Sequence, residues 1–195
     1  MLQYAGVLDK DVDTKMGPTT ESSTLQTSDV AALHAHYLQL YPAQGMLYYK
    51  ETAAAQQAGP QSTIHKWYNA TSNTWTWRGD EKYRGKGSVV SHRDPVTHQV
   101  VFGRVQYFFK HTYLDATHTF VYVVWFDFPS VDEESQLYMC KPDTHNPIVN
   151  PILVMSQLSE PHIVAQDEDE SIIFILDFMD RERSIELLGW IESLE

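Results

Sequence analysis

Residues 119 to 128 read Thr-Phe-Val-Tyr-Val-Val-Trp-Phe-Asp-Phe, the most strongly strand-forming stretch of the chain. Its β-branched and aromatic side chains suit a pleated, half-buried surface. Residues 100 to 109 read Val-Val-Phe-Gly-Arg-Val-Gln-Tyr-Phe-Phe and have the same character. Two such runs, separated by a loop around Asp115, predict an antiparallel hairpin.

Shorter segments of similar composition lie on both sides of this hairpin. They predict strands at residues 74–77, 88–92, 136–140, 153–158 and 172–178. The last of these is a continuous apolar run, which indicates burial on both faces. Many short strands around a strong hairpin indicate a mainly β fold, either a small antiparallel barrel or a curled sheet.

The two ends of the chain carry helical patterns instead. Ser28-Asp29 is a typical helix start and Pro42 a typical stop, so a helix is predicted over residues 29–41. A second helix is predicted near the C-terminus, where four apolar residues recur at helical spacing. These are Ile185, Leu188, Ile191 and Leu194.

These patterns divide the chain into four parts. We expect a flexible lead-in over residues 1–28, because residues 9–29 are polar and have no hydrophobic period. A helix and linker over 29–62 follow, then a β-barrel domain over 63–179 and a C-terminal helix over 180–195.

The charge of the chain is negative but uneven. A formal net charge of −12 argues against bulk nucleic-acid binding, because phosphates repel an acidic protein. Between residues 78 and 110, however, basic residues outnumber acidic ones by seven to three. Between 160 and 195, eleven acids face two basic residues. The basic middle and the acidic end either attract each other or are separately solvated.

No motif for catalysis, metal binding or a cofactor stands out. The single cysteine, Cys140, excludes an intrachain disulfide and is expected to be a small buried hydrophobe. Of the nine histidines, His34 and His36 form a His-x-His pair, but on a helix they point apart and no Glu follows to complete a metal site. The other seven have no metal-site spacing and are expected at the surface or in turns. Neither a nucleophile elbow nor a phosphate-binding loop is present. We therefore expect no cofactor, no metal and no enzymatic activity.

The expected location is the nucleus or the cytoplasm. No run of about 18 apolar residues is present, so no membrane span is predicted. The first residues lack the core of a signal peptide, and one cysteine gives no sign of an oxidising compartment.

An aromatic cluster between positions 67 and 83 is the best lead to a function. Its rings could form core, could cage a cationic side chain, or could stack single-stranded bases beside a basic groove. The predicted partner-binding residues, two of them from the central hairpin, are Trp75, Trp77, Tyr83, Tyr107 and Trp125. The residues predicted for nucleic-acid binding, as the alternative, are Arg78, Lys82, Arg84 and Lys86.

The segment from Gly87 to Phe178 resembles a bromo-adjacent homology (BAH) domain. The likeness rests on Phe-Gly-Arg-Val-Gln-Tyr-Phe-Phe at 102–109, Phe-Val-Tyr-Val-Val-Trp-Phe at 120–126, and the short apolar segments 137–139 and 150–154. A similar β-barrel segment accompanies the catalytic parts of transposon-derived proteins. After the Trp-Phe pair the chain departs from the family, with Asp127-Phe128-Pro129 where basic and proline residues are usual. The resemblance implies a barrel used for contacts with proteins or chromatin, without catalysis.

The sequence therefore predicts a non-enzymatic module that binds a protein or peptide. Histones are a candidate partner, since the acidic C-terminal region would attract basic tails. The alternative is a nucleic-acid-binding accessory domain of a mobile-element protein, which would use the stretch 66–110. A third hypothesis, an enzyme built from dispersed residues, needs a pocket with a histidine or carboxylate cluster. The oligomeric state stays open.

Overall fold

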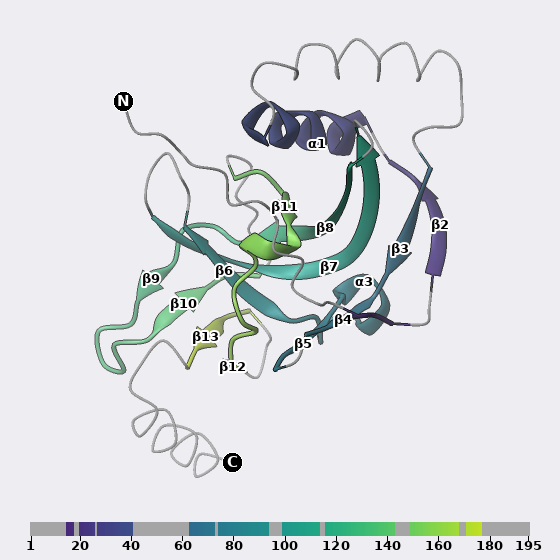
Figure 1. Ribbon diagram of the computed structural model, residues 1–195. Coiled ribbons are helices and arrows are strands. Elements are labelled where there is room, and N and C mark those ends of the chain that lie inside the picture. The colour runs from purple at the N-terminus through teal and green to yellow at the C-terminus, as the bar shows by residue number, and fades with distance from the viewer. Residues whose placement is uncertain are drawn as a thin grey trace. The chain divides into compact units, whose positions relative to one another are not determined.

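The computed structural model describes most of the chain between residues 15 and 176 (Figure 1). The described ranges are 15–17, 20–25, 27–40, 63–72, 74–93, 99–113, 116–142, 149–167 and 171–176. The predicted mainly β fold is confirmed, and the strand pairs are antiparallel. None of the described sheets closes into a barrel, so the curled sheet is the architecture consistent with the structure.

The chain forms two compact units whose segments alternate along the sequence. Unit 1 comprises residues 1–87, 105–123 and 150–158, and unit 2 comprises 88–104, 124–149 and 159–195. The predicted central hairpin is confirmed as strands β7 (Val100–Tyr113) and β8 (Ala116–Trp125). Each of these two strands begins in one unit and ends in the other.

The main sheet of unit 1 contains one strand that the sequence did not predict. Strand β2 (Thr20–Thr24) lies at the edge and pairs with β3 (Thr63–Trp67), which pairs with β7. A flexible lead-in over residues 1–28 is therefore wrong for β2 and for β1 (Lys15–Met16). The sequence of β2 shows no alternation of apolar and polar residues, because an edge strand tolerates Thr, Ser and Glu on its exposed positions.

Helix α1 (Thr27–Leu40) agrees with the helix predicted at 29–41, apart from residue 41, which lies outside the described residues. It lies against the ends of β7 and β8 (Figure 1) and buries Leu33 and Tyr37, which are one turn apart. Asn150 beside β11 (Ile152–Val154) donates its Nδ2 hydrogen to the Ala32 carbonyl at 3.0 Å. The core of unit 1 consists of Leu25, Leu33, Tyr37, Ile64, Tyr68, Tyr107, Phe109, Phe120, Ile152 and Val154.

A small three-stranded sheet completes unit 1. It is formed by β1, β4 (Asn69–Thr71) and β5 (Thr76–Arg78), and the short helix α3 (Asp80–Tyr83) follows it. The strand predicted at 74–77 begins two residues later, at Thr76. The Ser72 N–H bonds to the Trp75 carbonyl at 2.8 Å, so these two residues close the connection between β4 and β5.

Unit 2 contains a four-stranded sheet in the order β12-β13-β10-β9. Its strands are β9 (Ser130–Val131), β10 (Tyr138–Cys140), β12 (Val164–Gln166) and β13 (Ile173–Ile175). Strand β6 (Val89–Arg93) pairs with β7. The buried core consists of Val89, Phe102, Phe126, Cys140, Ile173 and Ile175.

Two predicted strands differ in detail from the observed ones. The segment predicted at 172–178 forms β13, where Ile173 and Ile175 are buried while Phe174 on the other face is half-buried. The strand predicted at 153–158 ends at Val154, and a 3-10 helix (Met155–Gln157) follows. The linker residues 41–62 and the predicted helix 180–195 lie outside the described residues. No helix in the described part of the chain has the length and apolar character needed to cross a membrane.

Candidate functional site

Three of the five aromatic residues predicted to bind a partner lie in the interior. Trp77 on β5, Tyr107 on β7 and Trp125 on β8 are buried, and the side chain of Tyr83 lies outside the described residues. A buried ring cannot present its face to a partner, so the three buried rings serve as core in this structure. Trp125, for example, packs against His92 with a centroid distance of 5.8 Å.

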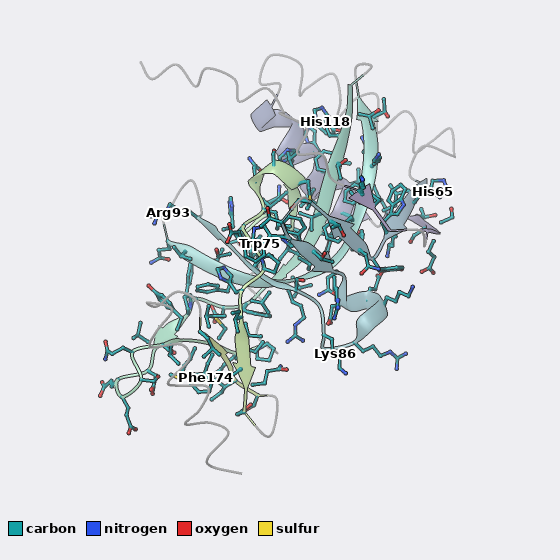
Figure 2. The ribbon with its side chains drawn as sticks, turned by 60° about the horizontal axis from the view of Figure 1, so that its bottom comes forward. His65, Trp75, Lys86, Arg93, His118 and Phe174 are labelled. Carbon is teal, nitrogen blue, oxygen red and sulfur yellow. The ribbon has the colours of Figure 1, made fainter. Side chains whose placement is uncertain are left out.

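Trp75 is the member of this set that the structure exposes, at 38% of its surface. It follows the turn between β4 and β5, where the Ser72 hydroxyl accepts the Trp75 N–H at 3.0 Å. Figure 2 labels its position. Trp75 and Trp77 are two positions apart, yet one is exposed and the other is buried.

The ring of Tyr107 is already in contact with a cation of the same chain. Lys66 Nζ lies 4.0 Å from the ring centroid, which is a cation–π distance. The same ammonium donates to both carboxylate oxygens of Glu81 at 2.7 and 3.0 Å. The Tyr107 ring also stacks on Tyr122 at 5.1 Å and lies 6.0 Å from the Phe109 ring. An outside lysine would have to displace Lys66 from this position.

Tyr68 extends this arrangement to the edge strand β2. Its hydroxyl donates to Glu21 at 2.6 Å and to Glu81 at 3.1 Å. Burial, followed by the bond to Glu21, raises the pKa of Tyr68 well above its ordinary value, so the phenol keeps its proton. Lys66, Tyr68, Glu21 and Glu81 thus form a polar network that links β2, β3 and α3 within unit 1.

The four residues predicted for nucleic-acid binding are all exposed. Arg78 ends β5, Lys82 lies in α3, and Arg84 and Lys86 lie in the turn that follows. Lys86 is labelled beside α3 in Figure 2. The two acids of this segment have partners: Asp80 accepts the Gly87 N–H at 2.9 Å and Glu81 accepts from Lys66. The basic side chains therefore dominate the exposed part of the segment.

A second exposed surface, which sequence reasoning missed, lies in unit 2. Among the described residues the large exposed hydrophobics are Trp75, Phe128, Val131 and Ile163, and the last three belong to unit 2. Phe128 is 41% exposed and Val131 is 47% exposed. Residues 127–136 also contain four acids and no basic residue. We call Phe128, Val131, Asp127, Glu133 and Glu134 the acidic-apolar surface.

The turn that carries this surface is held by its own hydrogen bonds. Asp132 accepts from the Ser135 backbone at 2.7 Å and from the Ser135 hydroxyl at 2.6 Å. These bonds lower the pKa of Asp132 below its ordinary value, so its carboxylate stays charged. The Asp132 N–H also bonds to the Leu137 carbonyl at 2.9 Å. Glu133 and Glu134 therefore stand on a fixed turn.

Strand β9 forms an edge of the four-stranded sheet, and its backbone is poorly suited to adding another strand. The Asp132 N–H bonds to Leu137, the residue before β10, and Val131 lies opposite Tyr138. The alternation of hydrogen-bonded and non-hydrogen-bonded pairs therefore turns the Val131 backbone groups outward. Pro129, the next outward position, has no N–H to offer. A proline and acids are typical protections of a sheet edge. A partner would therefore contact the side chains of this surface.

Three of the nine histidines, His36, His111 and His118, gather around a buried tyrosine in unit 1. For His111 and His118 this differs from the expected surface or turn position, since both are half-buried on strands. Tyr37 O–H and His111 Nδ1 are hydrogen-bonded at 3.0 Å, and the His118 ring centroid lies 6.0 Å from that of Tyr37. His36 is buried and packs on Phe120 at 5.3 Å. Burial, followed by the charge of His118, lowers the pKa of His111 to about 4.

One sequence signal could have revealed this cluster. His111 and His118 are equally distant from the loop of the predicted hairpin, so the two strands place them opposite each other. Tyr37 and His36 come from α1. Tyr37 and His111 are 74 residues apart in the sequence, so no local sequence pattern could have connected the helix with the two strands.

Cys140 is buried, as predicted, and burial raises its pKa to about 12. A thiol with that pKa is protonated at neutral pH and is a poor nucleophile. Within the described ranges, no three His, Cys, Asp or Glu residues are close enough together to hold a metal ion.

The chain was also compared with known proteins. No protein-family model matches it, and neither the curated proteins nor the solved structures contain a significant match.

Proposed function

We propose that this chain is a non-enzymatic interaction module that binds a protein or peptide partner through the acidic-apolar surface. The observation that carries the proposal is the exposure of Phe128 and Val131 beside three exposed carboxylates. Large apolar side chains buried against a partner supply most of the binding energy in many interfaces. Surrounding charges steer the partner and select its sign.

The partner that fits this chemistry is a basic segment with at least one apolar side chain. Lysine or arginine would meet Asp127, Glu133 and Glu134, and the apolar side chain would cover Phe128. The BAH-like resemblance in the sequence adds chromatin to the proposal, because histone tails are basic and extended. A nuclear location belongs to the same proposal.

The test is fluorescence anisotropy of the full chain with labelled histone-tail peptides at 50 and 200 mM salt. We expect salt-sensitive binding that Phe128→Ser weakens about tenfold. Ile163→Ser is the matched control, since Ile163 is 56% exposed and precedes β12 at the opposite edge of the same sheet. The affinity of the Ile163→Ser variant for the tail peptides should equal that of the unmodified chain.

Two outcomes would overturn parts of this proposal. If no tail peptide binds at either salt concentration, the chromatin version fails. If tails bind but Phe128→Ser and the double variant Glu133→Gln/Glu134→Gln have no effect, this surface is not the binding site.

A second candidate function is nucleic-acid binding, and the exposure of Arg78, Lys82, Arg84 and Lys86 favours it. Trp75 is exposed in the same unit and would stack a base. A single-stranded oligonucleotide at low salt tests this candidate. The variant Lys82→Gln/Lys86→Gln is compared with Lys141→Gln, an exposed lysine directly after β10 and outside the stretch 66–110, as the control. Undetectable binding below 50 mM salt would exclude it, whatever the result with peptides.

A further inference from the structure

Helix α1 rests on a ladder of ring pairs between β7 and β8. The first pair is Tyr107–Tyr122, stacked at 5.1 Å, and the second is Phe109–Phe120, stacked at 5.3 Å. The same strand register places His111 opposite His118 as the third pair. The next residues, Thr112 and Thr117, are joined by a hydroxyl–hydroxyl hydrogen bond of 2.8 Å just before the loop. Figure 2 labels His118 beside α1.

Tyr37 fixes α1 to this third pair. Its ring centroid lies 5.7 Å from His111, 6.0 Å from His118 and 5.7 Å from Phe120. Its hydroxyl is hydrogen-bonded to His111 Nδ1, and the whole side chain is buried.

We propose that the His111–His118 pair is a pH-sensitive latch for α1. A neutral His111 imidazole holds Tyr37, and protonation of His111, opposite His118, releases the helix from the sheet. The inference is independent of the proposed binding function, which concerns unit 2.

The chemistry of the hydrogen bond supports this latch. A neutral His111 can accept the Tyr37 proton at Nδ1 while its own proton is on Nε2. Once protonated, both ring nitrogens are donors, so the Tyr37 hydroxyl would have to turn round and accept instead. A second positive charge on His118, directly across the strands, would repel the first.

Among the described residues, the groups around the pair come from the four elements α1, β7, β8 and β11. Helix α1 supplies two titratable groups, Tyr37 and His36. The His36 ring makes edge contacts with the rings of Tyr37 and Phe120, which lie next to the pair. Strands β7 and β8 supply His111 and His118 themselves. Strand β11, which pairs with β8, adds the apolar residues Ile152 and Val154 to the same core. This apolar packing is the reason that a charge on His111 is unfavourable.

The transition is expected on the acidic side of neutrality. With a pKa of about 4 in the folded state and about 6.5 when released, His111 favours the packed helix fully above pH 6.5. That preference decreases as the pH falls from 6.5 towards 4. Release of α1 would expose the apolar face formed by Phe109, Phe120 and Ile152, so acid would uncover hydrophobic surface without unfolding unit 2.

The test is hydrogen–deuterium exchange of the full chain at pH 7 and pH 5, corrected for the intrinsic effect of pH. Between pH 7 and pH 5, exchange of residues 30–37 should increase about 20-fold relative to residues 173–176 of unit 2, as the His111 shift alone predicts. His118→Phe, which keeps the Tyr37–His111 bond, should reduce this increase, and Tyr37→Phe/His111→Phe should abolish it. His65→Gln, an exposed histidine on β3, is the control and should leave it unchanged.

Equal exchange of α1 at both pH values, relative to residues 173–176, would overturn the proposal. The same is true if the increase persists in Tyr37→Phe/His111→Phe. If that double variant does not fold, NMR titration of the His111 imidazole in the unmodified chain decides. A midpoint near 6.5 would show that protonation of His111 costs the folded protein no free energy, and the latch would be rejected.

Discussion

Lys66 makes two kinds of interaction from one shielded side chain. Its ammonium pairs with Glu81, lies over the Tyr107 ring and is largely shielded, since only 13% of the side chain is exposed. Shielded charge pairs are screened less by salt than pairs at the surface. The network around Lys66 should therefore stabilise unit 1 more than the other lysines of that unit do.

Replacing Lys66 with Met is expected to lower the free energy of unfolding by about 1–3 kcal/mol. The variant keeps an apolar side chain but leaves Glu81 and Glu21 close to Tyr68 without the compensating cation. Urea denaturation measures the effect, and Lys86→Gln, at an exposed position, is the control that should stay within about 0.5 kcal/mol. Equal stabilities for both variants would show that the Lys66 network contributes nothing.

Cys140 should react slowly in the native state. Its thiol is buried and its pKa is raised to about 12, so the thiolate that attacks an alkylating reagent is scarce at pH 7.5. Mass spectrometry after treatment with N-ethylmaleimide should show slow labelling in buffer and rapid labelling in urea. Rapid, complete labelling of the native chain would contradict the buried position.

At the scale of single elements, close packing explains why two glycines differ. A Cβ atom on Gly79 would clash with the Gln106 carbonyl oxygen of β7, and a backbone atom cannot easily move aside. Gly85 has open space around it but a φ of +77°, which disfavours any residue with a side chain. Gly79 is therefore required because a larger side chain would not fit, and Gly85 because its backbone adopts a left-handed conformation.

These two causes predict different costs for the same substitution. Gly79→Ala should destabilise the chain by about 2–4 kcal/mol, because β5 and β7 must separate. Gly85→Ala should cost only about 1 kcal/mol, through the strained left-handed backbone. Thermal unfolding of the two variants side by side checks the order, and a larger loss for Gly85→Ala would contradict it.

The elements also show which parts of the fold were predictable from the sequence. The hairpin of β7 and β8 and the helix α1 were found because their apolar residues recur with the period of the element. Strand β2 was missed, since five polar residues at a sheet edge carry no such period. Alternation would place Trp75 and Trp77, which are two positions apart, on the same face of a strand. Strand β5 begins only at Thr76, so Trp75 precedes the strand and is exposed while Trp77 is buried. The contacts of Lys66 with Tyr107 and of Tyr37 with His111 join distant parts of the sequence, so no local pattern predicts them. The acidic-apolar surface was recognised only when the exposed fractions of Phe128 and Val131 were known.

At the scale of the whole molecule, the predicted domain 63–179 omits residues that the core requires. Leu25, Leu33 and Tyr37 belong to the core of unit 1 and precede residue 63. Removing them would expose Phe109, Phe120 and Ile152 to water, at roughly 1.5–3 kcal/mol for each large apolar side chain. Such a loss compares with the whole stability of a small domain.

A fragment of residues 63–179 is therefore expected to lose the native fold of unit 1. Near-ultraviolet circular dichroism and urea denaturation would report this as a weakened aromatic signal and a lower midpoint. A fragment of residues 1–179 is the control, because it retains every described residue and should match the full chain. If the shorter fragment unfolds at the same urea concentration as the control, the contribution of β2 and α1 to the core is smaller than the structure indicates.

The alternation of the two units along the chain has a consequence for inheritance. Unit 1 is assembled from three separate stretches and unit 2 from three others, and strands β7 and β8 cross from one to the other. A genetic exchange at any position between residues 88 and 158 would separate pieces of both units at once. Neither unit can therefore be gained or lost by the shuffling of contiguous gene segments. Descendants of this gene should keep the region from β1 to β13 as one block, with insertions tolerated only in the connections between strands.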